Sequence, residues 1–158
     1  MLLSKTKFIL IISIFFLSGC GFKIIDKSEI NNFNIKKLEL TGEKRINYKL
    51  KNSFIRSSKK NSENILILKI DTTKNKSIKE KNIKNEITKY EILITAEIKI
   101  KMIKSGKAFS TSIGVTGDYS NERNYSITIA NEKSLIENLI TSLTNKTTNF
   151  INQKINDI

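Results

Sequence analysis

The stretch YEILITAEIKIKM, residues 90–102, decides the fold because it has the most regular pattern in the sequence. Every second residue from Tyr90 to Met102 is apolar, and most of the residues between them are charged or polar. Successive side chains of a β-strand point to opposite faces. This period of two therefore predicts a long strand with one covered face and one solvated face.

The neighbouring segments supply partners for that strand. The sequence KSGK at residues 104–107 predicts a hairpin turn, and the alternating residues 109–115 predict the returning strand. Earlier in the chain, residues 34–40 and the apolar run at 65–70 predict two further strands. These segments predict a four-stranded, largely antiparallel sheet with one apolar face.

Two segments have helical periodicity. In residues 43–57, Ile46, Leu50 and Phe54 recur at every fourth position. After a short apolar patch at 125–129, the sequence predicts a long terminal helix with Asn131 as its cap and Glu132 in its first turn. Its apolar stripe consists of Leu135, Ile136, Leu139, Ile140, Leu143, Phe150, Ile151 and Ile155.

Each of these elements has an apolar face that it must bury against another element. Two amphipathic helices packed on one face of the sheet satisfy this need, which predicts a two-layer α+β fold. Residues 33–158 are enough for one domain of ordinary size, and they contain no internal repeat. We therefore expect a single α+β domain over residues 33–158.

Residues 1–19 have the order of a secretory signal peptide. Lys5 and Lys7 precede an apolar run at 8–17, and the small residues Ser18 and Gly19 follow it. About ten residues rise only ~15 Å as a helix, roughly half the thickness of a bilayer core, which disfavours a permanent transmembrane anchor. We expect residues 1–19 to be removed on export.

The sequence Leu17-Ser-Gly-Cys20 resembles the lipobox of bacterial lipoproteins and contains the one cysteine of the chain. This resemblance implies lipidation of Cys20, with acyl chains such as palmitate, and makes residues 20–32 a lipidated tether. A free thiol or an intermolecular disulfide would not explain a cysteine at the foot of an apolar run. Gly21 in place of Asp resembles the Gram-negative sorting signal for the outer membrane, so the mature chain would face the periplasm.

The formal charge of the chain is +13, and it falls to +11 when Lys5 and Lys7 leave with the signal. Such a charge suits nucleic acid, anionic lipid headgroups or an acidic protein surface, and export removes most of the case for nucleic acid. The alternative is compositional bias, since the chain is rich in Lys, Asn and Ile and contains no Pro.

The residue types exclude most catalytic schemes. The chain has no His, and its only Cys is assigned to lipid, so Ser-His, Cys-His and His-based metal sites are impossible. Glu91 and Glu97 could form an acid-base pair, but on the solvated face of a strand they are better explained as a charged surface. No glycine-rich phosphate loop occurs. We therefore expect no enzyme activity, no catalytic residues, no metal and no cofactor.

A lysine-rich segment at residues 74–84 connects the second and third predicted strands. Its ammonium groups could meet the phosphates of a lipid headgroup, and we select Lys79, Lys81 and Lys84 as candidate contacts for lipopolysaccharide or another anion. The alternative is that these charges only solvate a loop.

The order lipobox, strand, helix, strand, long hairpin and terminal helix resembles the lipopolysaccharide-assembly lipoprotein family LptE. The most similar parts are CGF at residues 20–22, TKYEILI at 88–94, and the segment 119–143 that leads into the terminal helix. The chain lacks the Pro that related lipoproteins often carry after the phenylalanine, which affects only the tether.

The resemblance implies an outer-membrane lipoprotein without enzyme activity. It would be the plug and assembly partner of an LptD-like β-barrel translocon, and it would aid delivery of lipopolysaccharide to the outer leaflet. No individual contact residue is carried over from the family. Two alternatives stay open: a periplasm-facing lipoprotein that binds another envelope ligand, and a small enzyme that uses carboxylates alone.

Overall fold

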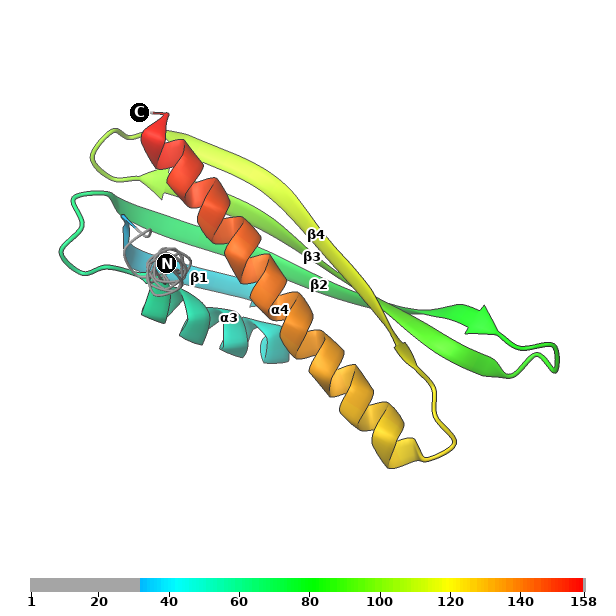
Figure 1. Ribbon diagram of the computed structural model, residues 1–158. Coiled ribbons are helices and arrows are strands. Elements are labelled where there is room, and N and C mark those ends of the chain that lie inside the picture. The colour runs from blue at the N-terminus through cyan, green and yellow to red at the C-terminus, as the bar shows by residue number, and fades with distance from the viewer. Residues whose placement is uncertain (1–31, 158) are drawn as a thin grey trace, which may run out of the picture.

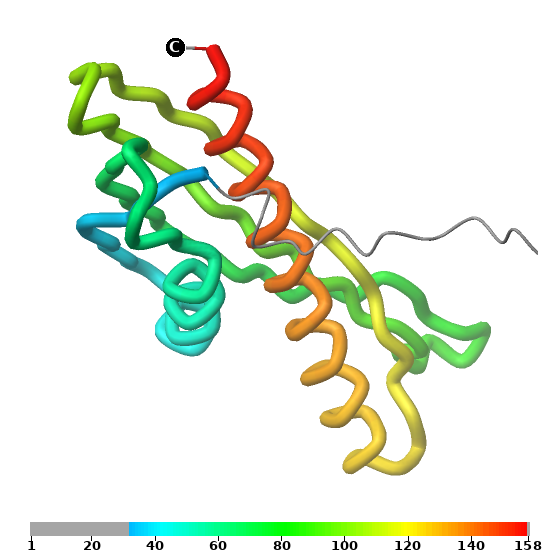
Figure 2. Tube along the Cα trace, turned by 60° about the vertical axis from the view of Figure 1, so that its left-hand side comes forward, coloured from blue at the N-terminus to red at the C-terminus, as the bar shows by residue number. Residues whose placement is uncertain are grey.

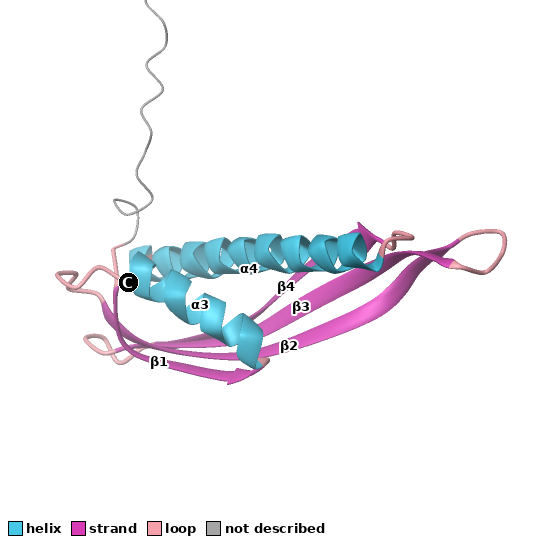
Figure 3. Ribbon diagram, turned by 90° about the horizontal axis from the view of Figure 1, so that it is seen from below, coloured by secondary structure: helices cyan, strands magenta, loops and turns pink. Residues whose placement is uncertain are grey.

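The computed structural model describes residues 32–157, and the signal and Cys20 lie outside this range. It is a two-layer α+β structure in which two helices cover one face of a four-stranded sheet (Figure 1, Figure 3). This confirms the predicted fold class. The elements are β1 (Asn34–Gly42), α3 (Lys44–Ser57), β2 (Ile65–Lys81), β3 (Ile87–Met102), β4 (Ala108–Ser120) and α4 (Tyr125–Asn156).

The strand with the period of two, β3, lies inside the sheet between β2 and β4 and is antiparallel to both. Its alternate residues from Ile92 to Met102 are buried beneath the helices, as the sequence pattern predicts. On the β2 side these residues meet alternate β2 residues, among them Leu68 opposite Ile100 and Leu66 opposite Met102. One face of the sheet thus supplies most of the core.

The first strand, β1, pairs with β2 in parallel, because the crossover helix α3 carries the chain back before β2 begins. Ile46, Leu50 and Phe54 are at most 1% exposed and form the buried stripe of α3, as predicted. At the junction of β1 and α3, Gly42 has a φ of +90°, which an L side chain rarely adopts.

The terminal helix α4 begins at Tyr125, earlier than predicted, and its N-cap is Asn124; the assignment of Asn131 as the cap was wrong. The Asn124 side chain accepts a hydrogen bond of 3.0 Å from the Ser126 amide, which satisfies one of the free donors of the first turn. Residues 125–129 therefore belong to the helix. No helix within residues 32–157 is both long and apolar enough to cross a membrane.

The second strand continues to Lys81, so most of the lysine-rich connection predicted for residues 74–84 is strand. The partners of β1 on β2 end at Thr72, whereas β2 and β3 remain paired from Thr73 opposite Thr95 to Lys81 opposite Ile87. We call residues 73–95 the projecting hairpin, because they extend past the end of β1. The strand β4 accompanies β3 only as far as Lys89, so the tip of the hairpin lies beyond every other strand (Figure 1, Figure 2).

Candidate functional site

The projecting hairpin carries the lysines that the sequence selected. Of these, Lys79 and Lys81 lie in β2, and Lys84 lies in the turn at the tip. They are therefore held by a strand and its turn, and not by the loop that the sequence predicted. The other predicted site residue, Cys20, lies outside the described residues, and its lipidation stays a prediction.

At the base of the hairpin, Lys76 joins four elements. Its Nζ lies 4.4 Å from the ring centroid of Tyr90 and 5.2 Å from that of Tyr119, and it pairs with a Glu132 carboxylate oxygen at 2.8 Å. The Tyr119 hydroxyl donates to the same oxygen at 2.7 Å, and the two tyrosine rings stack. This cluster ties the hairpin to β4 and α4.

Ionisation of the cluster reflects these contacts. Burial alone would lower the pKa of Lys76, but hydrogen bonds with Glu132 and Tyr119 outweigh burial and raise it. Burial would likewise raise the pKa of Glu132, but hydrogen bonds from Lys76 and Tyr119 lower it below its ordinary 4.5. The ion pair is therefore charged over the neutral pH range and stabilises the base of the hairpin.

Further along the hairpin, Lys79 is already neutralised by a carboxylate. Its Nζ lies 2.6 Å from Asp118 on β4, a contact that lowers the pKa of Asp118 and raises that of Lys79. An anion that approached Lys79 would have to compete with Asp118. Among the three predicted lysines, Lys79 is thus the least available.

The tip carries charge that no carboxylate neutralises. The Lys81 ammonium donates a hydrogen bond of 2.9 Å to the side-chain oxygen of Asn85, and neither Lys81 nor Lys84 pairs with a carboxylate among residues 32–157. Between them, Ile83 is fully exposed. The turn itself is well fixed, because the Asn82 side chain accepts from the backbone amides of Lys84 at 2.9 Å and Glu86 at 3.0 Å.

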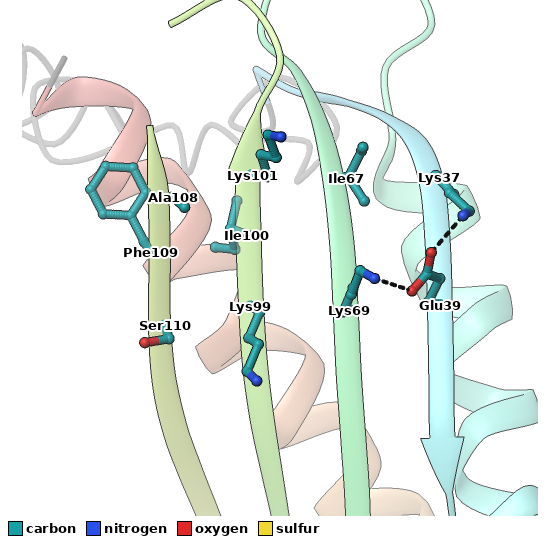
Figure 4. A pocket seen from close by; sticks show the side chains of 10 residues that line it. All are labelled: Lys37, Glu39, Ile67, Lys69, Lys99, Ile100, Lys101, Ala108, Phe109 and Ser110. Carbon is teal, nitrogen blue, oxygen red and sulfur yellow. Dashed lines mark ion pairs between the residues drawn. The ribbon is translucent and has the colours of Figure 1, made fainter. Parts of the chain in front are cut away.

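A second basic surface lies on the open face of the sheet, near the start of β1 (Figure 4). It is a depression of about 650 Å³ around Ile67, bordered by four lysines and one glutamate: Lys37, Lys69, Lys99, Lys101 and Glu39. Glu39 pairs with Lys37 and with Lys69 at 2.6 Å each, and these hydrogen bonds lower the pKa of its carboxyl.

Sequence reasoning missed this second surface. Its lysines come from three strands, and only the register of the sheet brings them together: Glu39 lies opposite Lys69, which in turn lies opposite Lys99. The signal in the sequence for this surface was the presence of lysines on the solvated faces of three predicted strands. The sequence pattern alone could not show that these strands are neighbours.

The carboxylate pair considered from the sequence is far apart. Glu91 and Glu97 lie on one face of β3 but six residues apart, which corresponds to ~20 Å at ~3.3 Å per residue. They cannot act on one bond together. No group of three acidic residues suited to holding a metal occurs within residues 32–157.

Several solved structures share this architecture at low sequence identity. A protein from Caulobacter crescentus described as a lipoprotein has a TM-score of 0.55 at 12% identity, over 83% of this chain and 95% of its own. The uncharacterized lipoprotein B of Nitrosomonas europaea has a TM-score of 0.52 at 13% identity, over 82% and 88%. A minor lipoprotein of Acinetobacter baumannii has 0.50 at 15%, over 79% and 95%.

This fold occurs in bacterial lipoproteins. No protein-family model and no curated protein matches the sequence. At identities of 12–15%, the likeness extends to the fold and not to the residues of a site.

Proposed function

We propose that this chain is an outer-membrane lipoprotein, anchored through Cys20, that plugs and helps to assemble a β-barrel translocon for lipopolysaccharide. The observation that carries the proposal is the combination of a lipobox in the sequence with a fold found in bacterial lipoproteins. The resemblance to the LptE family supplies the barrel partner and the lipid.

The form of the domain supports a plug. It is elongated, with α4 lying along one face of the sheet (Figure 3). Four depressions of about 220 to 650 Å³ on its described surface are open to solvent, and none of these four is the enclosed cavity that a carrier of a small ligand would need. Such a molecule acts through its outer surface.

The charges of the tip support contact with lipopolysaccharide. Lys81 and Lys84 flank the exposed Ile83, which combines point charges for phosphate groups with an apolar side chain for acyl chains. Lys79 is a weaker candidate, because Asp118 already pairs with it.

The first experiment is purification of the tagged, full-length, lipidated protein from its native envelope in detergent, followed by mass spectrometry of what stays bound. We expect a large β-barrel at about one copy per plug. The matched control is Cys20→Ala, which should lose the lipid mass while the domain stays folded. If wild-type protein brings down no barrel, the plug proposal fails.

A second candidate function is binding of another anionic envelope ligand. The specific observation in its favour is the depression of about 650 Å³, where Lys99 and Lys101 pair with no carboxylate among residues 32–157. Loss of binding in Lys99→Ala with Lys101→Ala, but not in Lys81→Ala with Lys84→Ala, would favour this function.

A further inference from the structure

The strand edges without a neighbouring strand differ sharply in composition on the two sides of the sheet. On one side they are the outer edge of β1, which carries Lys36, Lys37 and Glu39, and the outer edge of β2 beyond Thr72, where Lys74, Lys76, Lys79 and Lys81 occur. On the other side the edge is β4, where residues 108–117 contain no charged residue and no proline. Lysines on a free edge discourage pairing with other chains, whereas an uncharged edge permits it.

The hydrogen-bonding groups of β4 that face this free edge can be assigned from contacts. The Lys146 ammonium donates to the Gly114 carbonyl at 3.4 Å, so this carbonyl points away from β3. The Asn121 amide, by contrast, donates toward β3, to the Thr88 carbonyl at 2.8 Å. In an antiparallel strand the backbone groups of alternate residues point to the same side. The amides and carbonyls of the even-numbered β4 residues therefore point away from β3, toward the free edge.

The outward groups are also accessible. Within residues 108–117, the side chains of the even-numbered residues lie on the open face of the sheet, away from α4, and they are small and exposed. They are Ala108, Ser110, Ser112, Gly114 and Thr116. None of them can shield the row of amides and carbonyls beside it. In Figure 1, β4 forms the outer border of the sheet.

We propose that the free edge of β4 binds an extended, acidic segment of a partner protein, which adds a fifth strand to the sheet. In this binding mode, main-chain hydrogen bonds hold the added strand in register. Its first amide takes over the Gly114 carbonyl, and the released Lys146 ammonium pairs with a carboxylate on the added strand. The inference does not depend on the partner being a barrel.

A second copy of this chain is disfavoured as the occupant. Antiparallel pairing of two β4 strands about Gly114 would bring two Lys146 side chains to the same place. Without the signal, the chain still carries a formal charge of +11, which is the +13 of the whole chain less Lys5 and Lys7, so two copies also repel each other overall. Both features favour an acidic strand from a different protein.

Hydrogen exchange on the full-length, lipidated protein provides the direct test. The probe is the complex as it leaves the native envelope in detergent, compared with the same protein stripped of its partner. Residue-resolved exchange should show fast amides at Ser110, Ser112, Gly114 and Thr116 in the stripped protein. In the complex these amides should slow at least tenfold, while the odd-numbered amides, already paired with β3, change little.

Substitutions at Ser112 then test the need for the edge. Ser112→Pro removes an outward amide without breaking a hydrogen bond to β3. Ser112→Lys places on β4 a positive charge like those of the lysines on the free edge of β2, which discourage pairing. Both should lower the bound partner at least tenfold, with circular dichroism unchanged, whereas Ser112→Ala should retain it. Should the proline variant misfold, the lysine variant decides.

The contrary outcomes are distinct. The inference is overturned if folded Ser112→Lys keeps its full partner, if exchange in the complex slows equally at odd and even positions, if no protein stays bound, or if cross-linking yields only a homodimer. A barrel that binds without protecting β4 would sink this inference and leave the plug proposal intact. If a partner that is not a barrel protects alternate residues of β4, this inference stands and the plug proposal fails.

Discussion

Gly42 joins β1 to α3, and its replacement by alanine tests how tightly the first strand is held. A Cβ atom at this position would lie 1.9 Å from the Thr72 carbonyl oxygen, a backbone atom that cannot turn aside. The φ of +90° adds a conformational cost of ~1–2 kcal/mol. Moving β1 away would break the hydrogen bonds from the Glu43 amide to Thr72, at 3.2 and 3.1 Å.

At ~0.5–1.5 kcal/mol for each lost hydrogen bond, the total destabilisation by Gly42→Ala is about 3 kcal/mol. For a domain of this size that corresponds to a fall in Tm of ~12 °C. The matched control is Gly106→Ala, where φ is +69° and no atom lies within 4 Å of the new Cβ. The control carries only the conformational cost, ~1 kcal/mol or ~4 °C.

Thermal melting by circular dichroism, with urea unfolding at 25 °C, measures both variants of the mature chain. We expect the Tm of Gly42→Ala to fall about three times as far as that of Gly106→Ala. Equal losses in the two variants would show that the contact with Thr72 does not hold β1 in place, and the reasoning would be wrong.

Three further predictions concern the core, the base of the hairpin and the candidate site. Leu50→Ala removes a fully buried side chain of α3 and should lower the free energy of unfolding by ~3 kcal/mol in urea. Burial would raise the pKa of Glu132, but hydrogen bonds from Lys76 and Tyr119 lower it below its ordinary 4.5. The ionised carboxylate therefore stabilises the fold fully above about pH 4.5, and this stabilisation is lost as the pH falls through the lowered pKa. Glu132→Gln should therefore unfold more easily at pH 7 but lose less stability than wild type on acidification, and parallel pH curves would contradict this. Asp118→Asn frees Lys79 and should raise the affinity for lipopolysaccharide vesicles in low salt several-fold, as measured by co-sedimentation; unchanged affinity would exclude Lys79 from the contact.

Much of the fold was predictable, because an element with one buried face has apolar residues at regular intervals in its sequence. The alternation from Tyr90 to Met102 predicts β3, and the four-residue spacing of Ile46, Leu50 and Phe54 predicts α3. The second half of β2 was not predictable in this way. It has no apolar period, since residues 73–81 are all exposed, and its strand structure comes from pairing with β3.

The start of α4 was also misplaced, because Asn124 and Asn131 are equally good caps by residue type. Local contacts favour Asn124: the Thr128 hydroxyl donates to the Glu122 carbonyl at 3.2 Å and accepts from the Glu122 amide at 2.8 Å. These bonds hold the loop against the first turn of the helix. The sequence contains both asparagines but not this contact.

The candidate site was predictable in its composition and not in its pairing. The sequence shows that lysines gather at residues 74–84, but it cannot show that Lys79 faces Asp118, 39 positions away, while Lys84 stays unpaired. Ion pairs between strands depend on register, and register depends on the whole sheet. The free edge of β4 is likewise visible only once the order of the strands is known.

The length of β2 sets a distance between the two ends of the molecule. Its first residues lie beside the start of β1 and the end of α4, where Ile65 and Ile155 line one small depression. The strand then runs for 17 residues to the tip, which at ~3.3 Å per residue is a reach of ~55 Å. That span exceeds the ~30 Å apolar thickness of a bilayer. A chain held to a membrane at the first end could therefore present its lysines and Ile83 at a depth well beyond the lipid that holds it.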